Sequence, residues 1–517
     1  MMKVVWTSPC LLYPDKFYAG RRIAPEIFQT PFISDRLNVL GTPLTWMEAR
    51  HKGSSHLLDY PFLFNSSTLV GFFRAINFAS MSKASRESKV NTLLRTRLDF
   101  SPNMMDSFGN APRGSLRQSH RLSRFTNLHL VLDIRREYLL QDAFDQLWRR
   151  QKRELLRPMK VRLGQDYSEE GSDHGGVQQE FVRIAVAEAM DPKYGAFTTD
   201  PTNHMSWFQP GSLEPLYKFE LLGLLVSLAI YNGLILPFSF PIALYMKLLN
   251  HEPDCILDIV DGWPDLARGL SALHEWSDGD VEDAFCRTYT FSLDVFGVRK
   301  DIDMIPPTTT KGATSEDSPP MVTNANREAY IRDYIRQLTS ISVEQQYEAF
   351  AKGFKTVTNP KSLNLFTPTA LQTLVQGAPR IDTHALEAVT QYDGGFTRDH
   401  LLISHFWSIV HGWASPPSTV ESSTTPWSVP QDDRDAQEAG QAKVRGLLEF
   451  VTASDRLPAG GESRVTFLIQ KNGTGDERLP TSMTCFGHLL LPDYSSREVL
   501  EQKLIKAVEN AKGFGQP

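Results

Sequence analysis

The sequence predicts an α+β protein, and three observations lead to this class. A chain of 517 residues is too long for one ordinary core and indicates roughly two to four domains or lobes. From Tyr138 to about residue 375 the patterning is mostly helical. From Arg464 onward, short strand-like runs are followed by an amphipathic helix, and strands packed on helices make an α+β unit.

The first 124 residues form an N-terminal extension with partly helical character. Tyr60–Asn65 is a short apolar segment, and Leu69–Met81 predicts a helix. Residues 101–124 are rich in Ser, Asn, Gly and Arg, which is typical of a connector. Because Leu128–Leu132 then predicts a strand, we expect a new domain to begin at residue 125.

Two later stretches have the composition of inserts. Pro306–Pro320 is rich in Pro, Thr, Ser and Gly. Residues 414–440 are of low complexity, and we expect them to be disordered.

The C-terminal tail gives the clearest local prediction. Arg464–Gln470 and His488–Leu491 are strand-like, and Lys471–Asp476 is turn-like. Ser495 and Glu498 fit a capping box that opens a helix. The helix has a buried stripe and a glycine stop, formed by Leu500, Leu504, Val508, Ala511 and Gly513.

Charge and hydropathy argue against nucleic-acid and membrane roles. The net charge is -6, so no strong positive field covers the whole chain, and the basic excess in residues 1–124 is a remote hint of nucleic-acid binding. Leu221–Met246 is uncharged and long enough to span a bilayer. Since Asn232, Pro237 and Pro241 interrupt it, we favour a helix buried in a large core.

The four cysteines are Cys10, Cys255, Cys286 and Cys485, and they form no CxxC pair. We therefore expect no disulfide framework, no metal site and no cofactor, and a reducing compartment that is cytoplasmic or also nuclear. Cys485 lies between two strand-like pieces, where a thiolate can act as a nucleophile. From pattern alone, the alternative is a small buried apolar side chain.

Residues 478–515, RLPTSMTCFGHLLLPDYSSREVLEQKLIKAVENAKGFG, resemble without gaps the end of HECT ubiquitin ligases, whose signature is LPTSHTCFNxLLLPxYSS. His56–Ser85 weakly resembles a region upstream of some HECT domains. Further family motifs occur in order at Gly171–Phe181 (GSDHGGVQQEF), Val322–Tyr330 (VTNANREAY), Val343–Phe354 (VEQQYEAFAKGF), Tyr392–Asp399 (YDGGFTRD) and Arg456–Gly461 (RLPAGG).

The resemblance implies a bilobal HECT domain. A mostly helical N-lobe, residues 125–378, binds a ubiquitin-conjugating enzyme, and a small α/β C-lobe, residues 379–517, carries the catalytic cysteine. The hinge falls at Gly377, Ala378 and Pro379, where glycine absorbs backbone change.

Cys485 is then the residue that accepts ubiquitin as a glycyl thioester and passes it to a substrate lysine. Thr484 is a candidate to steady the tetrahedral oxyanion, and Phe514 matches a family phenylalanine that supports transfer. The implied partners are ubiquitin, a conjugating enzyme and a protein substrate that the sequence does not identify.

For the conjugating enzyme, the resemblance points to Leu270, Trp276, Asp283 and Phe285 in the smaller part of the N-lobe. An exposed aromatic in an apolar patch suits a modest, exchangeable interface. The alternative is that these are core residues.

Two departures from the family keep other functions open. Met483 stands where members commonly have His, and Gly487 where they commonly have Asn. Methionine does not move protons, so His488 is a candidate substitute, or the chain is a catalytically impaired ubiquitin-binding scaffold. A cysteine hydrolase would need an oriented Cys–His pair, and no such local signature is present.

Overall fold

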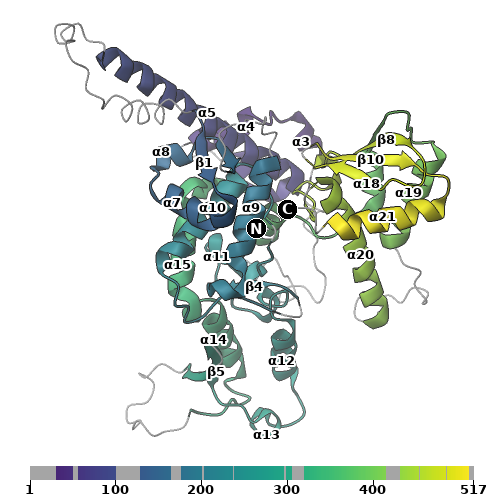
Figure 1. The fold of residues 1–517 in the computed structure, drawn as a ribbon. Helices are drawn as coiled ribbons and strands as arrows, with labels where there is room; N and C mark the ends of the chain where they lie inside the picture. The colour runs from purple at the N-terminus through teal and green to yellow at the C-terminus, as the bar shows by residue number, and fades with distance from the viewer. Residues whose placement is uncertain are drawn as a thin grey trace.

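The computed structural model describes residues 29, 31–49, 56–99, 128–164, 176–200, 203–236, 238–295, 298–304, 319–414, 431–452, 454–484 and 486–511. Within these ranges, buried apolar side chains form three separate cores. We call the corresponding bodies the large lobe, the small subdomain (256–338) and the C-terminal lobe (381–511) (Figure 1). The α+β class predicted from the sequence is confirmed, because long helices are combined with small sheets.

The large lobe is mainly helical and carries two small sheets. Strands β1 (Leu130–Ile134) and β2 (Met159–Leu163) are parallel, and β3 (Phe197–Thr199) and β4 (Ser206–Phe208) are antiparallel. Its helices are α3 (Pro31–Arg36), α4 (Gly41–Glu48), α5 (Ser66–Asp99), α7 (Leu139–Trp148), α8 (Lys152–Leu155), α9 (Gly176–Met190), α10 (Leu216–Tyr231), α11 (Ile242–Leu248), α15 (Glu344–Val357), α16 (Pro360–Leu363) and α17 (Pro368–Gln376).

Helices α10 and α15 meet at the centre of this lobe through a pair of glycines. A Cβ atom on Gly223 would lie 2.0 Å from the carbonyl oxygen of Phe350, and one on Gly353 would lie 1.8 Å from that of Glu220. The two backbones therefore touch directly, and no side chain larger than hydrogen fits at either position.

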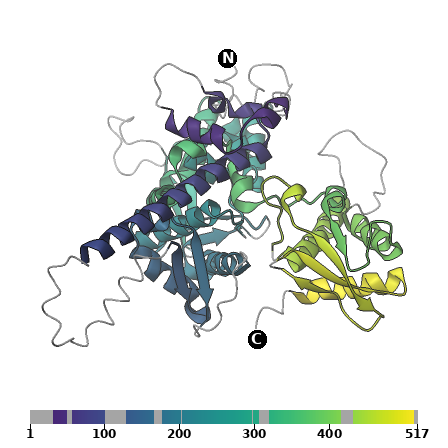
Figure 2. The ribbon, with the colours of Figure 1, turned by 90° about the horizontal axis from the view of Figure 1, so that it is seen from above.

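The described N-terminal helices belong to the same core, because apolar side chains between Trp46 and Ile76 are buried with those of the large lobe. Phe72 and Phe73 are fully buried, and the Phe73 ring meets Phe366 edge-on at 5.3 Å. The apolar faces of α4 and α5 need a partner, and the large lobe provides it. Beyond this contact α5 continues along the large lobe, where Ala84 and Ser88 are still buried (Figure 2).

The small subdomain projects from one end of the large lobe (Figure 1). It is built around buried Leu270, Val281 and Tyr330. Its elements are α12 (Pro264–Glu275), α13 (Val281–Phe285), the antiparallel pair β5 (Thr290–Val295) and β6 (Val298–Asp303), and α14 (Arg327–Thr339).

The C-terminal lobe is a four-stranded sheet with helices against it (Figure 1). The strand order is β7-β8-β10-β9, in which β8 runs parallel to β7 and β10, and β9 is antiparallel to β10. Its elements are α18 (Thr383–Val389), β7 (Gln391–Asp393), α19 (Leu401–Ala414), α20 (Gln431–Thr452), β8 (Leu468–Thr474), β9 (Thr481–Met483), β10 (His488–Asp493) and α21 (Arg497–Ala511).

Three local predictions in this lobe need correction. Residues 431–440 are helical, and the rest of the expected disordered insert, 415–430, lies outside the described residues. Strand β8 continues to Thr474, so the turn starts later than Lys471. Helix α21 is capped by Ser496, whose Oγ accepts from Val499 N, because Ser495 is held by Asp476 instead.

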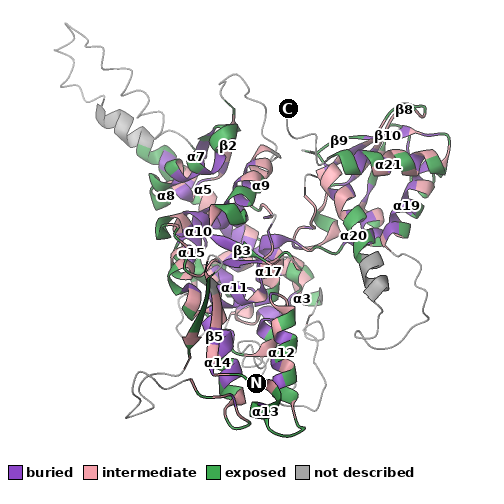
Figure 3. Cartoon of the chain, turned by 60° about the horizontal axis from the view of Figure 1, so that its bottom comes forward, coloured by how far each residue is buried: buried purple, intermediate pink, exposed green. Residues whose placement is uncertain are grey.

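No helix among the described residues has the length and apolar character needed to cross a membrane. The uncharged run Leu221–Met246 divides into the end of α10, a loop and α11. Residues 221–231 are all buried (Figure 3), as the buried-core interpretation predicted.

Candidate active site at the cleft between the lobes

The predicted nucleophile is placed by a short hairpin. Strands β9 and β10 pair in the register Met483–His488, Ser482–Leu489 and Thr481–Leu490, so residues 484–487 connect them. Cys485 and Phe514 themselves lie outside the described residues, but Thr484 and Phe486, on either side of Cys485, are described. The connection is a tight turn, in which Phe486 N donates to Met483 O at 3.0 Å.

Gly487 anchors this turn to the sheet. Its φ is +65°, and a Cβ atom would lie 2.1 Å from the carbonyl oxygen of Thr466. Its own carbonyl accepts from Leu468 N at 2.9 Å. Glycine at this position, where the family commonly has Asn, therefore brings the turn against the start of β8.

The side chains around the turn are open to solvent. Phe486 is 47% exposed and Met483 45% exposed, and Thr484 is also exposed. The rings of Phe486 and His488 lie 5.8 Å apart. Since directly paired residues of antiparallel strands point to the same face, Met483 and His488 share one side of the hairpin.

The turn borders a cleft of about 270 Å³ between the two lobes. Thr484, Phe486 and Gly487 line it from the C-terminal lobe. Gln179 and Ile235 line it from the large lobe. Thr484 and Phe486, the sequence neighbours of Cys485, therefore line a space formed by both lobes.

The predicted hinge lies beside this cleft. Gly377 ends α17 with φ +71°, and a Cβ atom there would lie 2.6 Å from the carbonyl oxygen of Leu457. Ala378 and Leu457 exchange two backbone hydrogen bonds, at 2.8 and 3.0 Å, while Pro379 is exposed. The linker is thus paired with a second segment of chain at the same boundary.

That second segment contains Arg456, which sequence reasoning missed. Its Nη2 donates to Ser239 Oγ of the large lobe at 2.6 Å. Burial lowers the pKa of Arg456. Burial also raises the pKa of Tyr245, and the nearby positive charge of Arg456 acts in the opposite direction and lowers it. RLPAGG is recognisable only as a family motif, and no local pattern indicates that its arginine reaches the other lobe.

The residues predicted to bind a partner lie in the small subdomain. Leu270 is 3% exposed and is a core residue in this structure. Trp276 and Phe285 are half-buried and meet edge-on at 5.5 Å, and Asp283 is exposed. The structure therefore brings the two aromatic rings together at the surface between α12 and α13, with Leu270 buried in the core.

The fold and the site define a two-lobed α+β protein with a cysteine-bearing turn at the cleft between its lobes. The chain belongs to the HECT-domain (ubiquitin-transferase) family, whose family model matches residues 183–417 and 436–516.

Several curated proteins are similar to this chain over about three quarters of its length. "Probable E3 ubiquitin-protein ligase HERC4" of Homo sapiens is 32% identical over 74% of the chain and 33% of the relative. "Probable E3 ubiquitin-protein ligase HECTD2" of Mus musculus is 33% identical over 75% of the chain and 46% of the relative. "Probable E3 ubiquitin-protein ligase HUL4" of Eremothecium gossypii is 29% identical over 75% and 43%. The chain thus spans between a third and a half of the length of these relatives.

Proposed function

We propose that this chain is an active HECT-type ubiquitin transferase whose Cys485 accepts ubiquitin from a conjugating enzyme and passes it to a substrate lysine. The observation that carries the proposal is the position of Thr484 and Phe486, which flank Cys485 in sequence and line the interlobe cleft. Family membership supplies the reaction class.

The chemistry consists of two acyl transfers. The Cys485 thiolate attacks the thioester carbonyl of charged ubiquitin, and the conjugating-enzyme thiolate leaves from the tetrahedral intermediate. A neutral lysine amine then attacks the new thioester, loses a proton and expels the Cys485 thiolate, leaving an isopeptide bond. Exchange of one sulfur for another needs no metal, and the covalent intermediate divides the reaction into two easier steps.

Stabilisation of the oxyanion is proposed for Thr484. In the observed turn, Phe486 N and Gly487 N donate to Met483 O and Thr484 O, so these two backbone donors are already used. The exposed hydroxyl of Thr484 is adjacent to Cys485 in sequence and is free to rotate toward a developing negative charge.

We further propose that the conjugating enzyme binds the small subdomain at Trp276, Phe285 and Asp283. Two half-buried rings in edge contact offer a rigid apolar anchor, and an exposed carboxylate beside them gives polar selectivity. Leu270 contributes by supporting this surface from the core. We place the reaction in a reducing compartment, the cytoplasm or nucleus, where the thiol of Cys286 and a reactive Cys485 persist.

A multiple-turnover assay tests the proposed activity. The full chain is mixed with activating enzyme, conjugating enzyme, ATP, ubiquitin and a lysine acceptor, and both isopeptide product and free ubiquitin are measured over time. A transferase forms product only when the conjugating enzyme is present. Binding of charged conjugating enzyme without product would favour the scaffold alternative, and release of free ubiquitin without conjugating enzyme would favour a hydrolase.

A further inference from the structure

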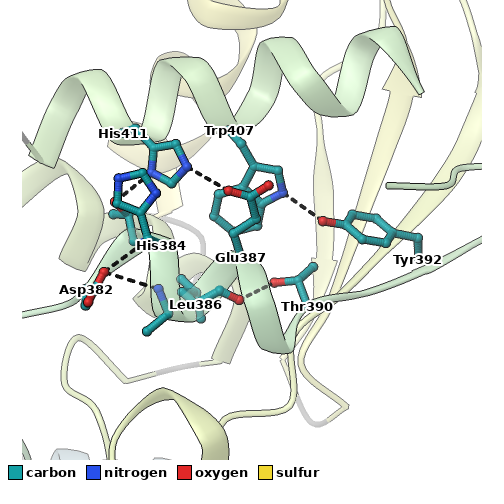
Figure 4. Close-up of polar contacts among 10 residues, drawn as sticks. Asp382, His384, Leu386, Glu387, Thr390, Tyr392, Trp407 and His411 are labelled. Carbon is teal, nitrogen blue, oxygen red and sulfur yellow. Dashed lines mark hydrogen bonds and ion pairs between the residues drawn. The ribbon is translucent and has the colours of Figure 1, made fainter. Parts of the chain in front are cut away.

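A cluster of two histidines and one glutamate lies in the C-terminal lobe, on elements other than the β9–β10 hairpin (Figure 4). His384 and Glu387 are three residues apart on α18, so they share one face of the helix. His411 reaches them from the last turn of α19. One donor atom from each side chain lies within 4.8 Å of the other two.

The ring of His411 is held in a defined orientation. Its Nδ1 is 2.8 Å from the hydroxyl of buried Thr383, and its Nε2 is 2.8 Å from Glu387 Oε2. Histidines that bind metals commonly have the second ring nitrogen hydrogen-bonded in this way, which fixes the tautomer and directs the other nitrogen at the ion. In the observed contact Nε2 donates to the Glu387 carboxylate. When an ion binds, Nε2 gives up this proton to solvent, and Nδ1 carries the remaining hydrogen and donates to the Thr383 hydroxyl, which is then the orienting group.

We propose that His384, Glu387 and His411 bind a divalent transition metal ion of the Zn²⁺ class. Imidazole nitrogens and a carboxylate oxygen suit such ions, and three protein ligands leave the fourth position for water. With metal–ligand bonds of about 2.0–2.2 Å, tetrahedral geometry separates two donors by roughly 3.3 Å. The 2.8 Å contact between His411 and Glu387 therefore needs to open only slightly.

His384 is the mobile member of the set. Its ring lies against that of His411, with centroids 3.9 Å apart and an interplanar angle of 22°. Parallel rings do not direct their lone pairs at one point, so the proposal requires a side-chain rotation of His384. This residue is exposed, which permits the rotation and gives an ion access from solvent.

Neighbouring residues hold the helix that carries Glu387 and the ring of His411 in place. The Asp382 carboxylate accepts from His384 N and Ala385 N and so caps α18. On the far side of His411, the Trp407 ring lies 5.8 Å away and its Nε1 donates to Tyr392 OH at 2.9 Å. Ligands on two packed helices are more rigid than ligands on loops, which favours a built site.

A second group of candidate ligands, Asp254, Cys255 and Asp258, is weaker. Asp258 Oδ2 already accepts from Asp254 N and Cys255 N and serves as a local cap. No sequence pattern predicts the cluster of His384, Glu387 and His411, because the two histidines are distant along the chain and fit no metal-binding motif.

Ion binding at His384, Glu387 and His411 would join α18 to α19. Helix α18 begins four residues after Pro379, so this connection would brace the C-terminal lobe next to the interlobe linker. The inference does not depend on ubiquitin transfer.

The test is a Co²⁺ titration of the EDTA-treated full chain, in which bound metal is quantified after desalting and the visible spectrum of bound Co²⁺ is recorded. We expect His384→Ala and Glu387→Gln each to bind one equivalent less than the unsubstituted chain, with affinity lowered at least about 100-fold. Glu387→Gln preserves shape and a hydrogen bond to His411, so it separates loss of a ligand from loss of folding. Thermal unfolding followed by circular dichroism in EDTA checks that both variants fold.

His405→Ala is the matched control, since it removes another α19 histidine outside the cluster and should keep the full stoichiometry and spectrum. Equal binding by all four proteins would overturn the proposal and indicate an adventitious ion only. A spectrum dominated by thiolate-to-cobalt charge transfer would also overturn it, because a cysteine would then hold the ion.

Discussion

At the scale of single residues, the pairing of Met483 with His488 bears most directly on catalysis. Members of the family commonly place histidine where this chain has Met483. The cross-strand partner here is a half-buried histidine on the same face of the hairpin. An imidazole is therefore present beside the turn that contains Cys485, supplied from β10 and not from β9. In the proposed reaction it is a candidate to remove the proton from the attacking lysine.

We predict that His488→Asn slows discharge of the Cys485 thioester to free lysine by at least about tenfold, because positioned proton transfer contributes of that order or more. Formation of the thioester should be unchanged, since a thiolate nucleophile has no proton to lose. Single-turnover discharge with preloaded chain measures the two steps separately.

The matched rescue is Met483→His in the His488→Asn background, which returns an imidazole to the same face. An unchanged discharge rate in His488→Asn would show that His488 takes no part. Failure of the rescue would restrict the role to the β10 position.

Some of the important single residues could be predicted from the sequence, and others could not. Cys485 could be singled out because its neighbours carry a long family motif. The exchange of Ser495 for Ser496 as the cap of α21 could not be foreseen, since it depends on Asp476, 19 residues away, which binds Ser495. The contact made by Arg456 could not be predicted for a similar reason, because its partner Ser239 is 217 residues away.

At the scale of elements, periodicity predicted the mostly helical stretch after Tyr138 and the C-terminal helix, but few of the individual helices, and composition misled in one place. The start of α20 is rich in Asp, Gln, Glu and Ala, which matches both disordered segments and good helix formers. The helical conformation is stabilised by a buried stripe that packs in the C-terminal core, formed by Val444, Leu447 and Val451. That stripe lies after residue 440, outside the stretch whose composition predicted disorder.

The contact between α10 and α15 gives a prediction at this scale. Gly353→Ala should lower the free energy of unfolding by about 1–3 kcal/mol or more, because its Cβ would overlap the carbonyl of Glu220 in a packed core. Urea denaturation followed by circular dichroism measures the change.

Gly269→Ala is the matched control, because Gly269 is an exposed interior residue of α12 and a methyl group added there would meet no atom within 4 Å. It should raise stability by up to about 1 kcal/mol, as expected for Gly to Ala in an open helix. If both substitutions shift the midpoint equally, the direct backbone contact does not limit packing.

At the scale of the whole molecule, the two lobes are held by two chain segments side by side. The linker Gly377–Pro379 pairs with Leu457, and Arg456 reaches Ser239. Ala459, three residues further on, is buried in the core of the large lobe. Besides the linker, a polar contact between Arg456 and Ser239 therefore connects the lobes beside the predicted hinge, which sequence motifs alone could not reveal.

We predict that Arg456→Ala loosens the connection between the lobes beside the proposed hinge. Loss of a charged donor from this partly buried contact costs up to about 1.5–3 kcal/mol, so the distribution of interlobe distances should broaden in small-angle X-ray scattering. In a double-mutant cycle with Ser239→Ala, the coupling energy for unfolding should be about 0.5–3 kcal/mol. Arg398→Ala, an exposed arginine of the same lobe, should leave both quantities unchanged, and zero coupling between Arg456 and Ser239 would refute the contact.

The shared core of the N-terminal helices also belongs to this scale. The rings of Phe73 and Phe366 are in contact, although the two residues lie near opposite ends of the large lobe in sequence. No local sequence pattern could therefore predict this contact. The weak family resemblance of His56–Ser85 was the one signal that this region joins the same assembly. Burial of Phe72 and Phe73 explains why residues 56–76 are part of the large lobe.

A thioester trap shows whether Cys485 carries ubiquitin, as proposed. The full chain and Cys485→Ala are each incubated with activating enzyme, conjugating enzyme, ATP and ubiquitin, then separated on gels with and without reductant. Cys286→Ala, at an exposed thiol of the small subdomain, is the matched control. We predict a reductant-sensitive ubiquitin adduct on the unsubstituted chain and on Cys286→Ala, and none on Cys485→Ala. An adduct that persists in Cys485→Ala, or none on any protein across a broad panel of conjugating enzymes, would contradict the account.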